Sequence, residues 1–522
     1  MKQIDFDSSS ISLNILQTAF PMFIAQAVNL LYSIVDRIYI GRIPGEGTAA
    51  LGGIGLVFPI ITLITAFTNL YGSGGAPLFA ISRGQGDSRR ASRLLNTAFR
   101  LEILTGILLT AIGFLFGRPI LYAFGASDQS IIYAWPYLRI YIWGTLFVMI
   151  STGMNPFINA QGFSQIGMIS VVIGAVCNIV LDPLFIFTLG FGIRGAAAAT
   201  VISQGLSAAF VLRFLLSPNS SAICRVTLKM PTAAAMPYAE NAPAAAMPYT
   251  ENARTSAMSY AENAPAAAMP YAKNAPAASA PLHTETAGKL SAADIFPNPR
   301  LTLSITSLGL AAFVMQFTNS LVTIVCNNTL MAYSSELYVS VMTLLSSLRQ
   351  VLELPAISIV EGSSPVLSYN YGAGHANRVR RAIFIMSAAD FIYTALGWLL
   401  VERAPRLLLS IFTTDESLIS ATLPAMHLYF MAFVFMALQH AAQSTFKALN
   451  KKRRAIFFSI FRKVIMVVPL TILLPRVIEP PVNGVFSAEP ISNLIGGSAS
   501  FIVMLLTVLP ELKRMEQHRL LS

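Results

Sequence analysis

The chain has 522 residues, of which 55% are hydrophobic and only 11% are charged, and its mean hydropathy of +0.63 excludes a soluble domain of this length. The formal net charge of +11 would suggest nucleic acid in a soluble protein. Here the basic residues gather at particular helix ends, so we expect contact with the lipid bilayer and no nucleic-acid partner. The three cysteines and five histidines show no metal-binding spacing.

Twelve apolar stretches are each long enough to cross a bilayer, which takes about 20 apolar residues. One long polar interruption separates the sixth from the seventh. The expected spans cover residues 14–41, 50–81, 94–117, 131–160, 164–189, 193–216, 301–332, 337–370, 378–402, 418–447, 454–478 and 484–510.

Basic residues concentrate on one side of the membrane if the spans alternate in direction. Arginine and lysine clusters follow the second, eighth, tenth and twelfth spans, whereas the opposite loops hold fewer basic residues and several acids, including Glu46, Asp128 and Glu489. Positively charged loops stay in the cytoplasm. We therefore expect a multi-pass protein of the plasma membrane with both termini in the cytoplasm.

The two halves of the chain repeat one another. Gln26 and Asn29 in the first span recur as Gln316 and Asn319 in the seventh, at an offset of 290 residues. The Gly-x-Gly turn after the second span recurs after the eighth at an offset of 288. The pattern predicts an all-α membrane protein with two six-helix lobes related by a pseudo-twofold axis along the membrane normal.

A segment of different composition separates the two halves. It is rich in Ala, Pro, Asn and Tyr, and an 11-residue unit that contains Met-Pro-Tyr or Met-Ser-Tyr occurs in it four times. Repeated proline and the scarcity of large apolar residues predict a disordered cytoplasmic linker. We therefore expect an N-lobe at residues 1–216, a linker at 217–300 and a C-lobe at 301–522.

Two carboxylates are notable because each lies inside a predicted span. Asp36 is about four residues from the end of the first span at Gly41, or about 6 Å at a rise of about 1.5 Å per residue. Asp182 is about eight residues before Gly190, or about 12 Å by the same rise. Both acids fall in the outer half of the bilayer and can face one another. Ionisable groups at such depth are costly and usually mark a transport pathway.

Polar side chains at similar depth surround the two acids. Tyr32 and Asn178 each lie one helical turn before an aspartate and share its face, and Thr200 in the sixth span lies about 9 Å deep. Pro183 cannot donate to the carbonyl of Ile179, which leaves an acceptor beside the second acid. Two carboxyl groups in a low-dielectric site favour holding a proton between them. The alternative is that these groups only hydrogen-bond neighbouring helices.

The C-terminal half lacks this arrangement. Cys326 occupies the position equivalent to Asp36, and apolar residues stand where Asn178 and Asp182 would recur. Any ion coupling is therefore expected in the N-lobe only.

Two other acids allow competing interpretations. Glu353 in the eighth span could attract a cationic substrate, but Arg349 one turn earlier could form an ion pair with it instead. Asp87 completes a GxGD pattern of the kind found in intramembrane aspartyl proteases. It stands among arginines in a loop, so a turn followed by a helix start is favoured over a protease.

The chain resembles the multidrug and toxic compound extrusion (MATE) family over all twelve spans. The resemblance is carried by Val35–Gly41 in the first helix, Asn178–Phe187 leading into Gly192–Thr200, and Tyr369–Ala373 after the eighth. It implies a V-shaped transporter, not an enzyme, that exports small, mainly cationic and lipophilic compounds in exchange for inward H⁺ or Na⁺ and needs no cofactor.

The resemblance also implies roles for particular residues. Family members that couple in the N-lobe match this chain at Tyr32, Asp36, Asn178, Asp182 and Thr200, where Na⁺ could take the place of H⁺. Other members use acids of the seventh and tenth helices, which are absent here. By the same resemblance Gln26, Asn29, Asn155 and Asn159 are candidate residues of the N-lobe cavity. The internal repeat adds Gln316 and Asn319 as C-lobe candidates, and Glu353 is added because of its charge.

We expect the transporter to be a monomer. Two other functions stay open. A flippase for a lipid-linked precursor would use the same lobes, but it predicts a cationic cavity for pyrophosphate, and few Lys or Arg lie in the middle of the helices. A membrane scaffold that transports nothing would not need acids at matched depth.

Overall fold

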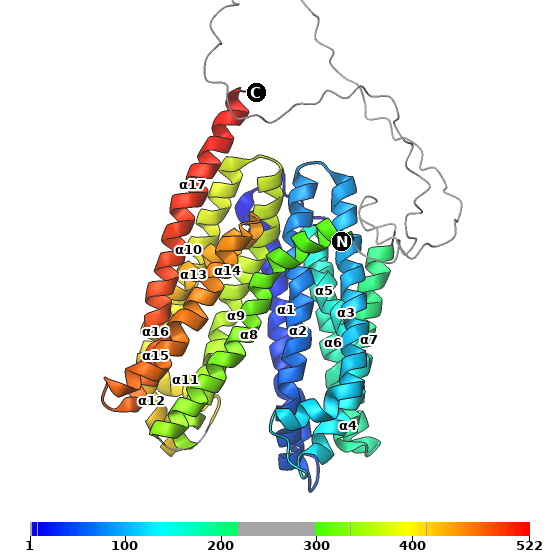
Figure 1. Cartoon of the computed structure of the whole chain (residues 1–522), viewed down its shortest axis with the longest axis vertical. Coiled ribbons are helices and arrows are strands. Elements are labelled where there is room, and N and C mark those ends of the chain that lie inside the picture. Colours follow the sequence, from blue (N-terminus) through cyan, green and yellow to red (C-terminus); the bar gives the residue numbers. More distant parts are fainter. Residues whose placement is uncertain (1–2, 8, 218–297, 335, 414, 522) are drawn as a thin grey trace, which may run out of the picture. The chain divides into compact units, whose positions relative to one another are not determined.

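The computed structural model describes residues 3–7, 9–217, 298–334, 336–413 and 415–521. The predicted linker at 217–300 lies almost wholly outside these residues. The described chain is helical and forms two bundles side by side (Figure 1). Within it, ten helices are long and apolar enough to cross a membrane, or eleven if one bent pair counts as a single span.

The N-lobe contains six spans, the fourth of which consists of two helices joined by a 3₁₀ turn. This interruption makes each piece too short to pass as a span alone. The helices are α1 (Ile11–Gly41), α2 (Gly47–Gly84), α3 (Ser88–Ala123), α4 (Ile131–Tyr141), α5 (Thr145–Ala160), α6 (Ser164–Pro183) and α7 (Gly192–Leu216).

The C-lobe repeats this plan with more breaks. Its tenth span is α12 and α13, bent by 52°, and its last two spans contain the π-helical segments η5 (Phe461–Val467) and η7 (Asn493–Gly497). The helices are α8 (Pro299–Tyr333), α9 (Glu336–Gly372), α10 (Ala376–Arg403), α11 (Pro405–Ser410), α12 (Glu416–Phe430), α13 (Phe435–Ala448), α14 (Lys452–Ile460), α15 (Val468–Leu473), α16 (Pro481–Ser492) and α17 (Ser498–Leu521).

The turns after the second and eighth spans have the same backbone form. Gly86 and Gly374, 288 residues apart, have φ values of 74° and 72°, a left-handed conformation that favours glycine. Asp87 follows the first turn and caps α3, because its side chain accepts a hydrogen bond from the amide of Arg90 at 2.8 Å. A turn followed by a helix start is thus the structural role of this motif.

The two lobes meet backbone to backbone along α1, α2, α8 and α9. A Cβ on Gly309 would lie 1.7 Å from the carbonyl oxygen of Leu70, and one on Gly74 would lie 2.7 Å from the amide of Gly309. A Cβ on Gly362 would lie 2.5 Å from the Cα of Ala19. Gly74 and Gly362 are repeat equivalents, as are Ala19 and Gly309. We call these four residues the glycine seam, and only residues this small allow such close approach.

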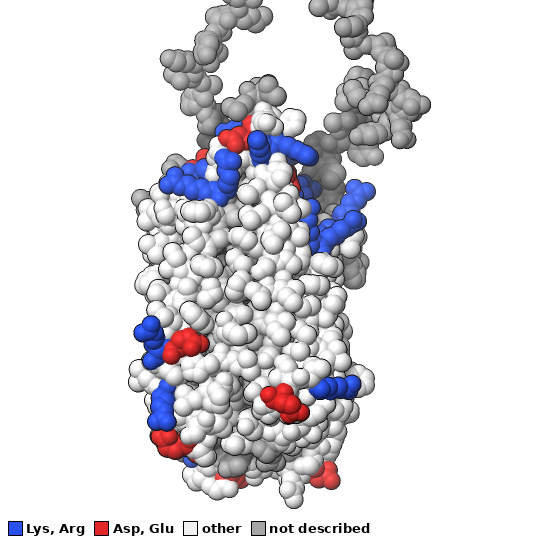
Figure 2. Space-filling model, turned by 90° about the vertical axis from the view of Figure 1, so that its left-hand side faces the viewer, with Lys and Arg blue, Asp and Glu red and all other residues white. Residues whose placement is uncertain are grey.

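Ala19 and Gly309 lie near the starts of α1 and α8, and Gly74 and Gly362 lie in the last third of α2 and α9. The glycine seam is therefore toward the end of the bundles where both termini are found, and the bundles separate toward the other end (Figure 1). We call these the terminal end and the far end. Figure 2 shows a band without charged residues on the C-lobe side, with many basic residues at the terminal end and both signs of charge toward the far end. Such a band is what a bilayer requires of a spanning protein.

Candidate functional site

The predicted coupling residues come from three helices that pack together toward the far end. α1 carries Tyr32 and Asp36, and it packs on α6, which in turn packs on α7. α6 ends at Pro183 and continues into the π-helical segment η2 (Leu184–Thr188). Proline lacks the amide that a regular helix would use, and π-helical turns are frequent at functional sites.

Asn178 is the centre of the hydrogen bonds in this site. Its Nδ2 donates to Oδ1 of Asp182 at 3.2 Å and to Oγ1 of Thr200 at 3.3 Å. The Thr200 hydroxyl donates to the carbonyl of Ala196 at 3.0 Å. Asp182, Asn178 and Thr200 are all buried. The amide therefore holds α6 and α7 in register and fixes the position of one carboxylate.

The carboxyl groups of Asp36 and Asp182 lie within hydrogen-bonding reach of each other. Asp36 Oδ1 and Asp182 Oδ2 are buried and accept no hydrogen bond from any described donor. Neither acid forms an ion pair with a described residue. Two buried carboxylates cannot share this space while both are charged, so a proton on one of them, or a cation between them, would satisfy the free oxygens.

Tyrosines complete the wall of the site. Tyr32 interacts electrostatically with both aspartates. Tyr137 and Tyr141 of α4 stack with ring centroids 6.1 Å apart and an angle of 14°, and Gln204 Nε2 donates to the Tyr141 hydroxyl at 3.5 Å. Sequence reasoning missed these two, although a pair of tyrosines one turn apart in the fourth span was an available signal.

The structure thus brings together Tyr32, Asp36, Asn178, Asp182 and Thr200, the five residues expected to bind the coupling ion. Their role stays a prediction. The other candidates are more scattered.

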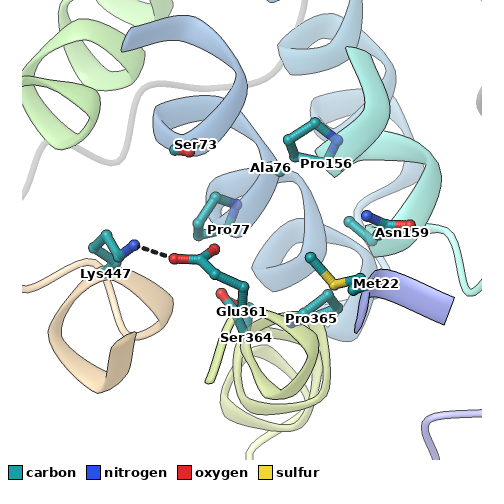
Figure 3. Close-up of a pocket in the computed structure, with 12 residues that line it drawn as sticks. Met22, Ser73, Ala76, Pro77, Pro156, Asn159, Glu361, Ser364, Pro365 and Lys447 are labelled. Atoms are coloured by element: carbon teal, nitrogen blue, oxygen red, sulfur yellow. Dashed lines mark hydrogen bonds and ion pairs between the residues drawn. The ribbon is translucent and has the colours of Figure 1, made fainter. Parts of the chain in front are cut away.

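Asn155 and Asn159 are largely engaged in helix packing. Asn155 Nδ2 donates to the carbonyl of Gly167 at 2.9 Å and to Ser170 Oγ at 3.0 Å, which ties α5 to α6. Asn159 lines a small cavity of about 60 Å³ between the lobes. Figure 3 shows this cavity, with the ion pair of Glu361 and Lys447 on its C-lobe wall at 2.6 Å.

Gln26 and Asn29 are exposed on α1, and Gln316 is half-buried on α8. Asn319 is exposed and lines a second cavity of about 600 Å³ in the C-lobe. The four repeated polar residues therefore do not converge on one described pocket.

A model of the MatE family matches residues 21–184 and again residues 311–473. Each lobe matches separately, and the two matches begin 290 residues apart, which is the offset of the internal repeat. The chain belongs to the MatE family.

Similar proteins agree with this assignment. The MatE chain is 28% identical over 231 residues to "Multidrug export protein MepA" of Staphylococcus haemolyticus, covering 44% of this chain and 51% of that protein. It is 24% identical over 225 residues to the protein of the same name from Staphylococcus aureus strain MRSA252, covering 43% and 49%. The match therefore spans about half the length of these relatives.

A solved structure of a multidrug resistance MATE family transporter of the MOP superfamily, in an outward-facing conformation, superposes with a TM-score of 0.80 at 19% identity. It covers 98% of this chain and 99% of the solved one. At this identity the likeness concerns the fold, and it confirms the predicted two-lobe, twelve-span architecture. Family membership and the long apolar helices together make the chain a multi-pass membrane protein of the MatE family.

The C-lobe of this MatE protein holds a buried charge cluster that the sequence analysis did not identify. Arg462 and Lys463 lie inside the eleventh span, and both side chains are buried. Their amino and guanidinium groups donate to Oε1 of Glu489, each at 3.0 Å. The expectation that few basic residues lie in the middle of the helices is therefore wrong for this lobe.

Glu489 was expected in a loop opposite the basic clusters, and this is also wrong. It is buried within α16 and receives a third hydrogen bond from Arg349 at 2.6 Å. Arg349 forms an ion pair with Glu353 as well, so the ion-pair interpretation of Glu353 is the observed one. The signal was present in the sequence, because charged residues inside spans are functional candidates by default.

Proposed function

We propose that this MatE transporter exports small organic, mainly cationic and lipophilic compounds and is driven by inward movement of H⁺ through the N-lobe. The relatives are named as multidrug export proteins, which supports the substrate class. The paired carboxyl groups of Asp36 and Asp182 carry the proposal of proton coupling. No cofactor enters it.

The carboxyl pair is suited to this task because it has no fixed cation. A buried carboxylate next to Arg or Lys stays charged, whereas a carboxyl beside another carboxyl gains a proton easily and loses it when its surroundings change. Na⁺ is the alternative ion, since Asp36 Oδ1, Asp182 Oδ2 and Asn178 Oδ1 are oxygens without a described donor.

The proposed orientation places both termini in the cytoplasm of a plasma-membrane monomer. The basic residues at the terminal end support this, because positively charged loops remain cytoplasmic. The closed glycine seam then lies on the inside, and the carboxyl pair lies toward the open outer side.

The transport cycle follows from this placement. A proton that enters from outside binds the Asp36 and Asp182 pair and changes the packing of α1, which Pro21 allows to bend. Bound drug leaves to the outside, the lobes rock, and the proton is released inside. Coupling requires only that the proton and the drug stabilise different conformations of the lobes.

One feature of the C-lobe cavity supports the flippase alternative, and another argues against it. Basic residues do line the C-lobe cavity, but Glu353, Glu361 and Glu489 pair with most of them. The named relatives favour drug export.

The test uses purified protein in liposomes with an imposed pH gradient and, separately, a Na⁺ gradient, with ethidium movement as the signal. Wild type is compared with Asp36→Asn, which keeps the size of the side chain. Asp128→Asn is the matched control, because Asp128 is an exposed loop acid.

We expect the pH gradient to drive ethidium movement in wild type and in Asp128→Asn but not in Asp36→Asn. Full pH-driven export by Asp36→Asn would reject N-lobe proton coupling. Ethidium movement that only the Na⁺ gradient drives would identify Na⁺ instead of H⁺ as the coupling ion. If neither gradient moves ethidium in wild type, the proposed substrate class is wrong.

A further inference from the structure

The C-lobe contains a cavity large enough for an organic molecule. It has a volume of about 600 Å³ and is lined by α8, α9, α13, α16 and η5, with two residues of the N-lobe, Arg37 and Phe58, at its edge. Pockets of this size commonly bind small ligands. Apolar walls are provided by residues such as Met342, Val467 and Val485.

Three cations converge on one carboxylate oxygen in this cavity. Glu489 Oε1 accepts hydrogen bonds from Arg349 at 2.6 Å and from Arg462 and Lys463 at 3.0 Å each. Glu353 pairs with Arg349. The group of three cations and two carboxylates therefore holds one uncompensated positive charge.

The remaining lining charges do not cancel this surplus. Lys447 and Glu361 pair with one another at 2.6 Å. The N-lobe residue Arg37 adds a further positive charge at the edge of the cavity, with its guanidinium 5.7 Å from the ring of Phe58. The described lining residues thus contain more basic than acidic side chains.

Asp390 on α10 lies beside His440, which lines the cavity, and it also leaves the surplus in place. It is fully buried, its only described ionic neighbour is His440 Nδ1 at 3.7 Å, and neither of its carboxylate oxygens accepts another described hydrogen bond. An isolated buried carboxylate is too costly to keep its charge without a partner. Asp390 therefore does not offset the surplus positive charge.

Arg462 also keeps a donor free. Its side chain is only 9% exposed, its Nη1 donates to Asn493 Oδ1 at 2.6 Å, and its buried Nε donates to no described acceptor. A buried guanidinium strongly prefers to use its donors on an acceptor, and a carboxylate or phosphate suits it best. The surplus charge and this incompletely paired guanidinium group thus both belong to residues that line the cavity.

We propose that the C-lobe cavity binds the anionic group of an amphipathic organic anion, with Arg462 and Lys463 as its recognition residues. The anion supplies the missing negative charge, and its apolar body lies against the Met and Val walls. This site goes beyond the proposed export of cations, because it concerns an anion in the opposite lobe.

The experiment measures binding without any ion gradient, so its result is independent of the export assay. Purified protein in dodecyl maltoside is dialysed to equilibrium against 1-naphthoate or against 1-naphthamide, which has nearly the same shape without the charge. Wild type is compared with Lys463→Met and with the control Lys513→Met, whose target is an exposed lysine of α17.

We expect wild type and Lys513→Met to bind 1-naphthoate at least about tenfold more tightly than 1-naphthamide. Lys463→Met should lose this preference. Equal binding of both probes by wild type, or an unchanged preference in Lys463→Met, would overturn the proposal.

Two further measurements protect the test from trivial loss of folding. Glu489→Gln removes one negative charge and should bind 1-naphthoate more tightly than wild type, the opposite sign to Lys463→Met. In thermal unfolding, 1-naphthoate should raise the midpoint of wild type but not that of Lys463→Met. The reverse in either measurement contradicts the site.

The natural anion can be a soluble compound or a lipid. Phosphatidylglycerol or phosphatidylcholine is therefore added to the micelles during the 1-naphthoate measurement. Displacement by phosphatidylglycerol alone identifies a lipid phosphate as the occupant, and displacement by neither identifies a soluble anion. Displacement by both lipids to the same extent would contradict recognition of the anionic group.

Discussion

The two lobes share one helical plan but have opposite polar interiors. In the N-lobe, the acids Asp36 and Asp182 face one another with amide and hydroxyl groups around them. In the C-lobe, Arg349, Arg462 and Lys463 surround a single carboxylate. The repeat thus conserves the scaffold while the charge at its centre changes sign.

This difference teaches that the backbone plan and the interior chemistry are set by different residues. The turns at Gly86 and Gly374 and the glycine seam follow the repeat offsets, because helix packing depends on backbone approach. The charged positions do not follow them. Cys326 stands where Asp36 would recur, and it contacts Thr471 at 3.8 Å instead of another acid.

The largest expected effect is on transport through the N-lobe. Asp182→Asn should reduce ethidium export driven by a pH gradient to the level of empty liposomes, because the remaining acid has no carboxyl partner for the proton. The double variant Asp36→Asn/Asp182→Asn should be no worse, since the two groups act as one unit. If Asp182→Asn keeps some export and only the double variant loses it, the two acids act independently and not as one unit.

The next effect is on the stability of the C-lobe. Glu489→Leu leaves three buried cations with a single acid and should lower the free energy of unfolding by about 3–5 kcal/mol. Asp182→Asn removes no partner of a cation and should change it by less than about 1 kcal/mol. Thermal unfolding in detergent compares the two, and similar losses would mean that the lobes do not differ as described.

A transplanted acid sharpens the comparison further. Cys326→Asp places a carboxyl at the C-lobe equivalent of Asp36, in a cavity wall shared with Lys463. An ion pair with this lysine would keep the new acid charged, so Cys326→Asp should not restore pH-driven export to the Asp36→Asn variant. Restored export in the liposome assay would show that position alone, and not the surrounding charge, decides coupling.

The smallest effect concerns the equivalent helix starts of the two lobes. Asp87 caps α3 through the amide of Arg90, and Asp87→Ala should cost about 1 kcal/mol. His375 is its repeat equivalent and makes no side-chain cap on α10. His375→Ala should therefore cost less in the same unfolding measurement, apart from its contact with Asp7 at 3.1 Å.

Much of the fold was predictable because it depends on hydropathy and spacing. The apolar stretches located the spans, and the offsets of 290 and 288 predicted two lobes before any contact was known. The meeting of Asp36 and Asp182 followed from depth along two helices of known rise. Each of these inferences uses the sequence of one helix, or of one pair of helices, and needs no knowledge of how distant helices pack.

The C-lobe cluster was not predictable in the same way. An 18-residue window of the helical run Lys452–Arg476 has a mean hydropathy of 2.1, so the apolar neighbours of Arg462 and Lys463 hide these two charges. Glu489 lies close to the start of its span, where it looked like a loop acid. The convergence of these residues with Arg349 depends on three helices that are distant in sequence. Such a meeting follows from tertiary packing and not from local periodicity.

The glycine seam has a consequence for how the transporter separates sensing from closure. At Gly74, Gly309, Gly362 and Ala19 the lobes meet through backbone and methyl groups, with one hydroxyl, Thr18 Oγ1, that donates to the Gly362 carbonyl at 2.6 Å, so none of these groups titrates or carries a charge. The seam itself therefore adds no pH dependence to the contact between the lobes. Under the proposed function, sensitivity to ions must therefore come from residues outside the seam. A change in protonation at Asp36 and Asp182 would then shift the equilibrium between closed and open lobes while the seam contact itself stays unchanged.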